Sequence, residues 1–167
     1  MNWAPEPASF RRTLGHYPTG VCAVTAMQAG GAPAGMVVGS FTSVSLEPPL
    51  VGFFPDRAPT SWPKISAAGR FCVNVLAENQ LALCKALASK AEDKFKDIPY
   101  TLSETGQPIL EGVAAWIDCD LYAIHEAGDH FVALGKVIAL IAEASRDQLI
   151  FHKVGYGRFA ALDSALV

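Results

Sequence analysis

The sequence predicts a mainly β fold, a closed antiparallel barrel with a few peripheral helices. Short runs rich in β-branched and aromatic residues recur along the 167 residues, and segments of hairpin length join several of them. Helical periodicity is confined to brief stretches. The expected strands do not alternate regularly with helices, and no G-x-G-x-x-G motif links a strand to a helix, so a doubly wound parallel sheet is disfavoured. The length fits a single domain over residues 1–167.

The chain begins with an expected arm and a short helix. We expect residues 1–8 to form a flexible arm and Ser9 to cap a helix over residues 10–14, which Gly15 ends. A turn at residues 17–20 then leads into the first strand.

The remaining elements follow from β-rich runs and turn signals. The expected strands cover residues 21–27, 34–38, 50–54, 71–76, 115–124, 130–141 and 149–152. Thr60 or Ser61 is expected to cap a short helix with Pro63 in its first turn, where proline is tolerated. Asn79 is expected to cap a second helix over residues 80–89. The polar segment that follows, residues 90–110, reads as turns.

Composition narrows the class of protein. The chain is 51% hydrophobic and 17% charged, which supplies a sizeable core and enough surplus apolar surface to make a homo-oligomer plausible. No run reaches the roughly 18 apolar residues of a membrane span. The net charge is −3 without any basic block, so no nucleic-acid partner is expected.

Cysteine, histidine and N-terminal patterns add three expectations. The four cysteines stand singly in apolar surroundings and are interpreted as buried, reduced thiols. The four histidines lack metal-ligand spacing, so no metal site is expected. The N-terminal residues lack a basic segment followed by an apolar one, which favours a cytoplasmic protein over a secreted one.

The densest candidate site is the segment 39–45. It holds four hydroxyl side chains within six positions, next to the end of an expected strand: Ser40, Thr42, Ser43 and Ser45. Hydroxyls and backbone N–H groups suit a ring carbonyl or a phosphate, and Gly39 would let a flat ligand approach the backbone. Composition alone favours the alternative, a β-bulge or an edge strand whose hydroxyls cap turns.

Two further segments carry chemistry-bearing side chains. Arg57, Thr60, Ser61 and Lys64 gather at an expected helix start, which is either an anion site or ordinary N-capping with solvated charges. Gly128-Asp129-His130 either presents an imidazole at a pocket mouth or is a plain hairpin turn. No arrangement for nucleophilic catalysis stands out.

Taken in order, these pieces resemble the short-chain flavin reductase family, the small reductase components of two-component monooxygenases. The resemblance runs from about Phe10 to Phe159. It rests on the ordered set of residues 17–21, 35–51, 61–62, 69–76, 128–130 and 155–158. It implies an antiparallel Greek-key split barrel of the FMN-binding type, and a homodimer with one flavin per subunit near the interface.

The resemblance also implies the site residues. The flavin ring and ribityl chain would lie against Val38, Gly39, Ser40, Phe41, Thr42, Ser43 and Ser45. Other cofactor-binding residues would be Arg57, Thr60, Ser61 and Trp62 near the phosphate, Lys90 and Phe95 in a stretch with room for adenosine, and Tyr156. Gly128, Asp129 and His130 would lie on the nicotinamide side, with His130 as the catalytic residue. Many relatives carry Asn or Ala where Gly39 stands, so polar contacts there must come from the backbone.

The implied activity is hydride transfer from NADH or NADPH to FMN or FAD, with reduced flavin diffusing to a partner monooxygenase. Two alternatives stay open from the residues: a flavin-retaining redox carrier or oxidase on the same barrel, and a non-catalytic flavin or haem binder. No membrane partner is expected.

Overall fold

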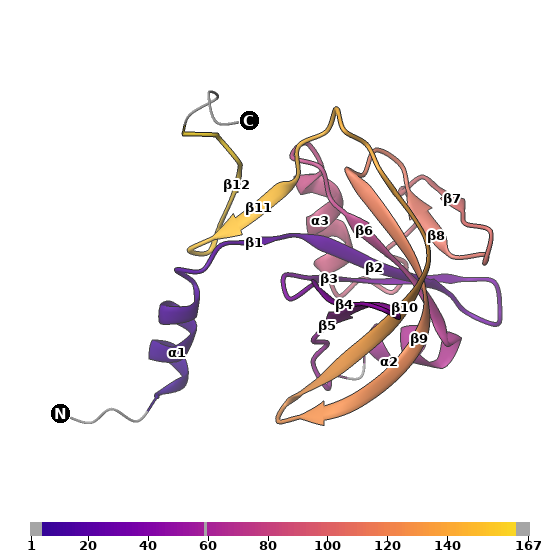
Figure 1. Cartoon of the computed structure of the whole chain (residues 1–167), viewed down its shortest axis with the longest axis horizontal. Helices are drawn as coiled ribbons and strands as arrows, with labels where there is room; N and C mark the ends of the chain where they lie inside the picture. Colours follow the sequence, from indigo (N-terminus) through magenta and orange to yellow (C-terminus); the bar gives the residue numbers. More distant parts are fainter. Residues whose placement is uncertain (1–4, 59, 163–167) are drawn as a thin grey trace.

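Seven antiparallel strands form the main sheet of the computed structural model, which describes residues 5–58 and 60–162 (Figure 1). In spatial order they are β3 (Pro33–Val38), β2 (Cys22–Met27), β6 (Arg70–Val75), β9 (Ala115–Ala127), β10 (His130–Ala142), β5 (Pro49–Phe53) and β4 (Thr42–Leu46). Every pairing is antiparallel, which confirms the predicted fold class. Strands β3 and β4 form the two edges, and no described residue pairs them, so the predicted barrel is open there.

The opening of the sheet is crossed by the candidate segment itself. Strands β3 and β4 are consecutive in the chain although they lie at opposite edges of the sheet. Residues 39–41 are the only link between them, so this short loop spans the split. The hydroxyl-rich segment is therefore partly a bridging loop and partly the edge strand β4.

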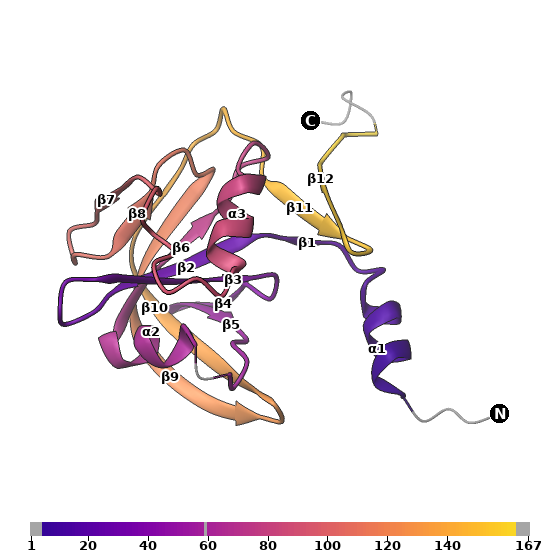
Figure 2. The same cartoon turned by 180° about the vertical axis from the view of Figure 1, so that it is seen from behind.

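Two helices and a hairpin cover the sheet, one helix on one face of β2 and the other helix with the hairpin on the opposite face. Helix α2 (Trp62–Ala68), helix α3 (Leu81–Ala88) and the hairpin β7 (Tyr100–Leu102)–β8 (Pro108–Leu110) pack around the strands (Figures 1 and 2). Helix α1 (Pro7–Leu14) and the small sheet β1 (Thr19–Gly20)–β11 (Leu149–His152)–β12 (Gly155–Arg158) project to one side. Helix α1 buries none of its residues.

Two hydrophobic clusters lie on the two faces of β2. Val24 and Ala26 belong to the cluster that contains Phe53 and Phe71, while Ala23 belongs to the cluster around α3 and β8. Side chains alternate between the two faces of a strand. Both faces of β2 are therefore buried, which explains its nearly continuous apolar sequence.

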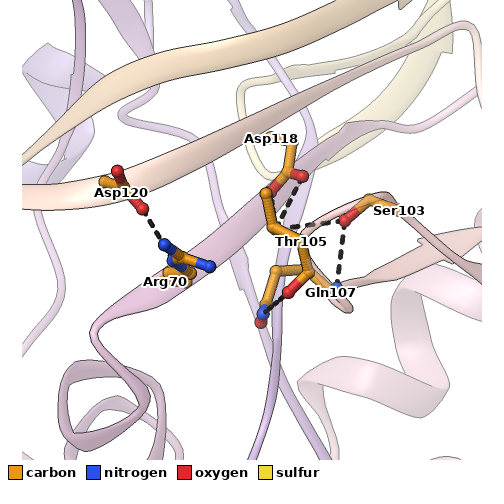
Figure 3. A network of polar contacts seen from close by, with 6 residues as sticks. All are labelled: Arg70, Ser103, Thr105, Gln107, Asp118 and Asp120. Carbon is orange, nitrogen blue, oxygen red and sulfur yellow. Dashed lines mark hydrogen bonds and ion pairs between the residues drawn. The ribbon is translucent and has the colours of Figure 1, made fainter.

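A buried carboxylate joins the β7–β8 hairpin to β9 (Figure 3). Asp118 is 1% exposed, and the Thr105 hydroxyl lies 2.7 and 2.9 Å from its two carboxylate oxygens. Beside it on β9, Asp120 accepts a hydrogen bond of 2.8 Å from Arg70 Nε. The Thr105–Asp118 contact holds the polar segment 90–110, which was expected to form turns, against the sheet.

Several element boundaries differ from those predicted. Helix α1 begins at Pro7 with Glu6 as its N-cap, not Ser9, because proline fits the first helical turn. Helix α3 begins at Leu81 with Gln80, not Asn79, as its N-cap. Strand β1, the β7–β8 hairpin and β12 were not predicted, and the edge strand β4 was named only as an alternative. Residues 1–4 of the expected arm lie outside the described residues, and two more, 7 and 8, are helical.

Candidate functional site

A cavity of about 630 Å³ lies at the split in the sheet. It is lined by the end of β3, the bridging loop, the residues after β5 and the β9–β10 turn: Met36, Val37, Val38, Gly39, Ser40, Phe54, Asp56, Ala127, His130, Phe131 and Val132. Most of these side chains are apolar, and Ser40, Asp56 and His130 supply polar groups. This size and lining suit a flat aromatic ligand with a few polar atoms.

The bridging loop forms one wall of this first cavity. Ser40 Oγ accepts a hydrogen bond of 2.9 Å from the backbone N–H of Phe54, which ties the loop to the end of β5. A Cβ on Gly39 would lie 3.0 Å from Thr19 Oγ1, closer than ordinary contact allows. Because glycine has no Cβ, the loop and the neighbouring strand β1 can lie close together without this clash. The backbone of Gly39 also stays accessible to a ligand in the cavity.

The rest of the predicted segment lies beyond the cavity wall. Of its seven predicted residues, Val38, Gly39 and Ser40 line the cavity. Phe41 packs against the core. Thr42, Ser43 and Ser45 belong to β4, where Thr42 and Ser43 are exposed. The edge-strand alternative thus describes the second half of the segment.

The turn between β9 and β10 forms the opposite wall. Gly128 adopts a φ of +65°, which a glycine accepts without strain, and His130 opens β10 with its side chain 46% exposed. His130 Nδ1 donates to Asp129 Oδ1 at 2.7 Å. This hydrogen bond, with the charge of His130, lowers the pKa of Asp129 below its ordinary value. The imidazole is thereby held at the cavity mouth by a fully solvated carboxylate.

The loop after β5 fastens this turn in place. The backbone N–H of Arg57 donates to Asp129 O at 3.1 Å, and the N–H of Phe131 donates to Pro55 O at 2.9 Å. The Arg57 guanidinium lies 4.9 Å from the centre of the Phe131 ring and 3.5 Å from Glu126 Oε2. An aromatic face and a carboxylate hold its cation against the β9–β10 turn, whereas Thr60, Ser61 and Lys64, with which Arg57 was predicted to gather, line a different cavity.

A second cavity, of about 510 Å³, continues along β3. Residues 33–35 of β3 line it while residues 36–38 line the first cavity, and Asp56 lines both. Its other walls come from the α2 loop and the segment after α3: Ala58, Thr60, Ser61, Lys64 and residues 88–95. This cavity thus brings together two separately predicted groups, Thr60, Ser61 and Lys64 from the helix start and Lys90 and Phe95 from the later stretch.

Lys94 is a feature of this second cavity that the sequence reasoning missed. Its Nζ donates to Leu87 O at 2.9 Å and to Ser61 Oγ at 3.0 Å, and lies 3.5 Å from Gly35 O. Burial, together with the nearby charge of Lys64, lowers its pKa from the ordinary 10.5. The one available signal was its position directly before Phe95, in a stretch already selected for its basic ends.

Three aromatic residues that were predicted to bind the cofactor contact other side chains of the protein in the structure. Trp62 is buried in the core, with its ring 5.6 Å from that of Phe53. Phe95 is 8% exposed and fills the space beneath Gly35, where a Cβ would come within 2.9 Å of its ring. Tyr156 lies on β12 beside a separate cavity, with its hydroxyl 3.7 Å from Cys84 Sγ, and does not join the other predicted residues within one chain.

Other chemistries find little support in the described part of the chain. Residues 5–58 and 60–162 contain no group of three or more His, Cys, Asp or Glu placed to hold a metal ion. All four cysteines are free and buried, and burial raises the pKa of Cys22 and of Cys119 to about 12. Among the described helices, none has the length and apolar character needed to cross a membrane.

Comparison with known families decides the identity of the fold. A profile described as the flavin reductase like domain matches residues 14–160. The chain belongs to the flavin reductase family. A flavin reductase from Pseudomonas putida is 60% identical over 159 residues, covering 95% of this chain and 94% of that protein.

The chain is also similar to a monooxygenase reductase subunit and to an oxidoreductase of known structure. The reductase subunit HsaB of a flavin-dependent monooxygenase from Rhodococcus jostii is 44% identical over 92% of this chain and 78% of its own length. The NADH:FAD oxidoreductase SgcE6 of Streptomyces globisporus, solved in complex with NAD and FAD fragments, superposes with a TM-score of 0.87. It is 32% identical, covering 95% of this chain and 98% of its own. The split-barrel fold expected of the flavin reductase family is thus confirmed.

Proposed function

We propose that this protein is an NAD(P)H:flavin oxidoreductase that reduces FMN or FAD for a partner monooxygenase. The observation that carries the proposal is the first cavity, an apolar space of about 630 Å³ with the Gly39 backbone on one wall and His130 on the other. The names of the similar proteins, a flavin reductase and a monooxygenase reductase subunit, support the same activity.

The residues present fit a flavin. The apolar side chains of the first cavity, among them Met36, Val38 and Phe131, would cover an isoalloxazine ring. Glycine at position 39 lets the ring approach the backbone, since any Cβ would already crowd Thr19. The second cavity continues along β3 and holds hydroxyl and ammonium groups suited to the phosphate end. FMN and FAD both offer this combination of ring and phosphate.

When bound, the flavin supplies the redox chemistry by accepting a hydride from NADH or NADPH. The chain's contribution would be positioning: the loop 39–41 and the β9–β10 turn would hold the flavin and the nicotinamide between them, and holding both would make the transfer nearly intramolecular. His130 lines the open mouth and is proposed to orient the nicotinamide, with Asp129 fixing its imidazole. The reaction requires no strong general acid, in keeping with the absence of a catalytic triad in the sequence.

The proposal extends to assembly and location. Large apolar side chains on α1 and on strands β4 and β10 are exposed, including Phe10, Leu14, Leu46 and Leu140, and Leu46 is 92% exposed. Such surface supports a homodimer that covers it. Four free cysteines support a reducing compartment, and we place the protein in the cytoplasm. Reduced flavin would leave the open first cavity and diffuse to the monooxygenase.

Anaerobic mixing tests the proposed activity without a partner enzyme. The protein is mixed with FMN and then with NADH carrying deuterium at the transferred position, and loss of the visible absorbance of oxidised flavin is followed. We expect rapid bleaching that slows with the deuterated substrate, because C–H cleavage occurs in the step. Bleaching no faster than with free FMN and NADH would contradict the proposal.

A further inference from the structure

The hydroxyl of Thr19 is buried beside the bridging loop without a hydrogen-bond partner. Among residues 5–58 and 60–162, Thr19 Oγ1 is the only buried side-chain nitrogen or oxygen in this state. Leaving a buried polar group unpaired is costly, and such groups are rare in native proteins. The Thr19 hydroxyl therefore needs a partner that the described conformation does not supply.

The peptide group between Gly39 and Ser40 lies next to this hydroxyl and is also unpaired. A Cβ on Gly39 would lie 3.0 Å from Thr19 Oγ1, so the backbone of residue 39 and the hydroxyl are neighbours. In the described part of the chain, neither the carbonyl oxygen of Gly39 nor the backbone N–H of Ser40 has a hydrogen-bond partner. Gly39 and Ser40 line the first cavity, whereas Thr19 does not. This peptide group thus separates the hydroxyl from the cavity, with a free donor and a free acceptor.

The residues on either side of this peptide group allow it to rotate. Glycine has no Cβ and adopts a wider range of backbone conformations than other residues. Ser40 is held by its side chain, since Oγ accepts a hydrogen bond of 2.9 Å from the N–H of Phe54. Rotation of one peptide plane changes only ψ of the residue before it and φ of the residue after it. The plane can therefore turn over while both ends of the loop stay in place.

The two redox states of a flavin favour different orientations of this peptide group. N5 of the oxidised ring is a hydrogen-bond acceptor, whereas N5 of the reduced ring bears a hydrogen and donates. The oxidised ring is therefore complementary to a loop that presents the Ser40 N–H to the cavity, and the reduced ring to one that presents the Gly39 carbonyl. When the N–H faces the cavity, the carbonyl points to the opposite side, where the Thr19 hydroxyl lies.

We propose that Thr19 is a positioning residue that acts through the Gly39–Ser40 peptide group and lowers the affinity for reduced flavin relative to oxidised flavin. Its hydroxyl donates to the Gly39 carbonyl in the orientation that suits the oxidised ring and is left without a partner in the other. The hydroxyl thereby stabilises the complex that reacts with the nicotinamide, so that reduced flavin leaves readily. The inference rests on the proposed function and adds a residue that controls release of its product.

Affinities for the two redox states of FMN test this inference. Oxidised FMN is titrated by fluorescence, and the midpoint potential of bound FMN, measured anaerobically with a reference dye, gives the affinity for the reduced form. Thr19→Val removes the hydroxyl at nearly constant volume, and Thr19→Ser keeps it. Thr13→Val is the matched control, the same change at an exposed residue of α1.

The expected result is a selective loss of affinity for the oxidised form. Thr19→Val should weaken binding of oxidised FMN about 5- to 10-fold and of reduced FMN less than about 2-fold, because one hydrogen bond is lost in one state only. A tenfold change in the ratio of the two affinities raises the midpoint potential by about 30 mV. Thr19→Ser and Thr13→Val should match the parent protein. Equal weakening of both redox states in Thr19→Val would overturn the inference.

A second measurement uses the unmodified protein, in case Thr19→Val fails to fold. Crystal structures of the FMN complex before and after reduction with dithionite should show the Gly39 carbonyl first on Thr19 Oγ1 and then toward the ring. The same orientation in both redox states would overturn the role of Thr19 and leave the proposed function intact. A protein that binds neither form of FMN would contradict the proposed function itself.

Discussion

Ser40 Oγ accepts a hydrogen bond of 2.9 Å from the backbone N–H of Phe54. The contact joins the loop that crosses the split in the sheet to the strand β5 on the far side of the opening. Both residues line the first cavity. The bridging loop is therefore tied to the end of β5 by one of its own side chains, and the hydroxyl of Ser40 acts first as a structural clamp.

Removing this clamp should weaken flavin binding. Ser40→Ala leaves the Phe54 N–H without its acceptor and frees the 39–41 loop, which we expect to cost about 1 kcal/mol of unfolding free energy. FMN affinity should fall several-fold, measured by fluorescence titration. Ser145→Ala, at an exposed turn, is the control and should change neither quantity. An unchanged FMN affinity in Ser40→Ala would show that the loop is held by other contacts.

The contact between Gly39 and Thr19 predicts a coupled pair of substitutions. Gly39→Ala places a Cβ 3.0 Å from Thr19 Oγ1, so the loop or β1 must shift, and we expect weaker flavin binding and a lower melting temperature. Thr19→Ala removes the obstructing hydroxyl. The double variant should therefore recover much of the loss, a non-additive result. If the losses of flavin affinity and melting temperature in the double variant equal the sum of those in the two single variants, Thr19 is not the obstacle to a side chain at position 39.

His130 should affect the nicotinamide more than the flavin. His130→Ala removes the imidazole at the mouth of the first cavity, and we expect a several-fold increase in KM for NADH with FMN affinity nearly unchanged. His152→Ala, an exposed histidine on β11, is the matched control. Equal NADH kinetics in His130→Ala and the parent would refute the proposed role.

The Asp129–His130 hydrogen bond predicts a pH effect of known sign. The pKa of Asp129 is lowered by His130, so its contribution to stability is present above the ordinary aspartate pKa and is lost as pH falls through the lowered value. In His130→Gln the pKa of Asp129 should rise toward its ordinary value. Carbon-detected NMR titration of the Asp129 carboxyl group measures this, and the same pKa in both proteins would rule out the pairing in solution.

Much of the fold could be predicted because its central strands carry local signals. The β2–β3 and β9–β10 hairpins combine β-branched runs with glycine-containing turns, and both are present. The edge strand β4 was named only as an alternative because its Thr-Ser-Val-Ser sequence resembles a turn, and it becomes a strand by pairing with β5. The β7–β8 hairpin was missed for a similar reason, since it depends on the buried contact between Thr105 and Asp118.

The candidate site was predictable only where its residues fell in recognisable segments. Gly39, Ser40 and His130 lie on the two walls of the first cavity, although some 90 positions separate them in the sequence. Asp56 and Phe131 reach the cavity through the pairing of Asp56 with His130, which no local pattern reveals. The place of the Arg57 side chain could not be predicted, because the Phe131 ring that its guanidinium lies over is far away in sequence.

The central claim, that this chain reduces free flavin with a nicotinamide, is tested most directly by steady-state NADH oxidation with FMN, FAD and riboflavin in parallel. We expect NADH consumption that requires added flavin, saturates with it and is more efficient with FMN or FAD than with riboflavin. The purified protein without added flavin should consume NADH slowly or not at all. Failure to oxidise NADH or NADPH with any of the three flavins would contradict the account.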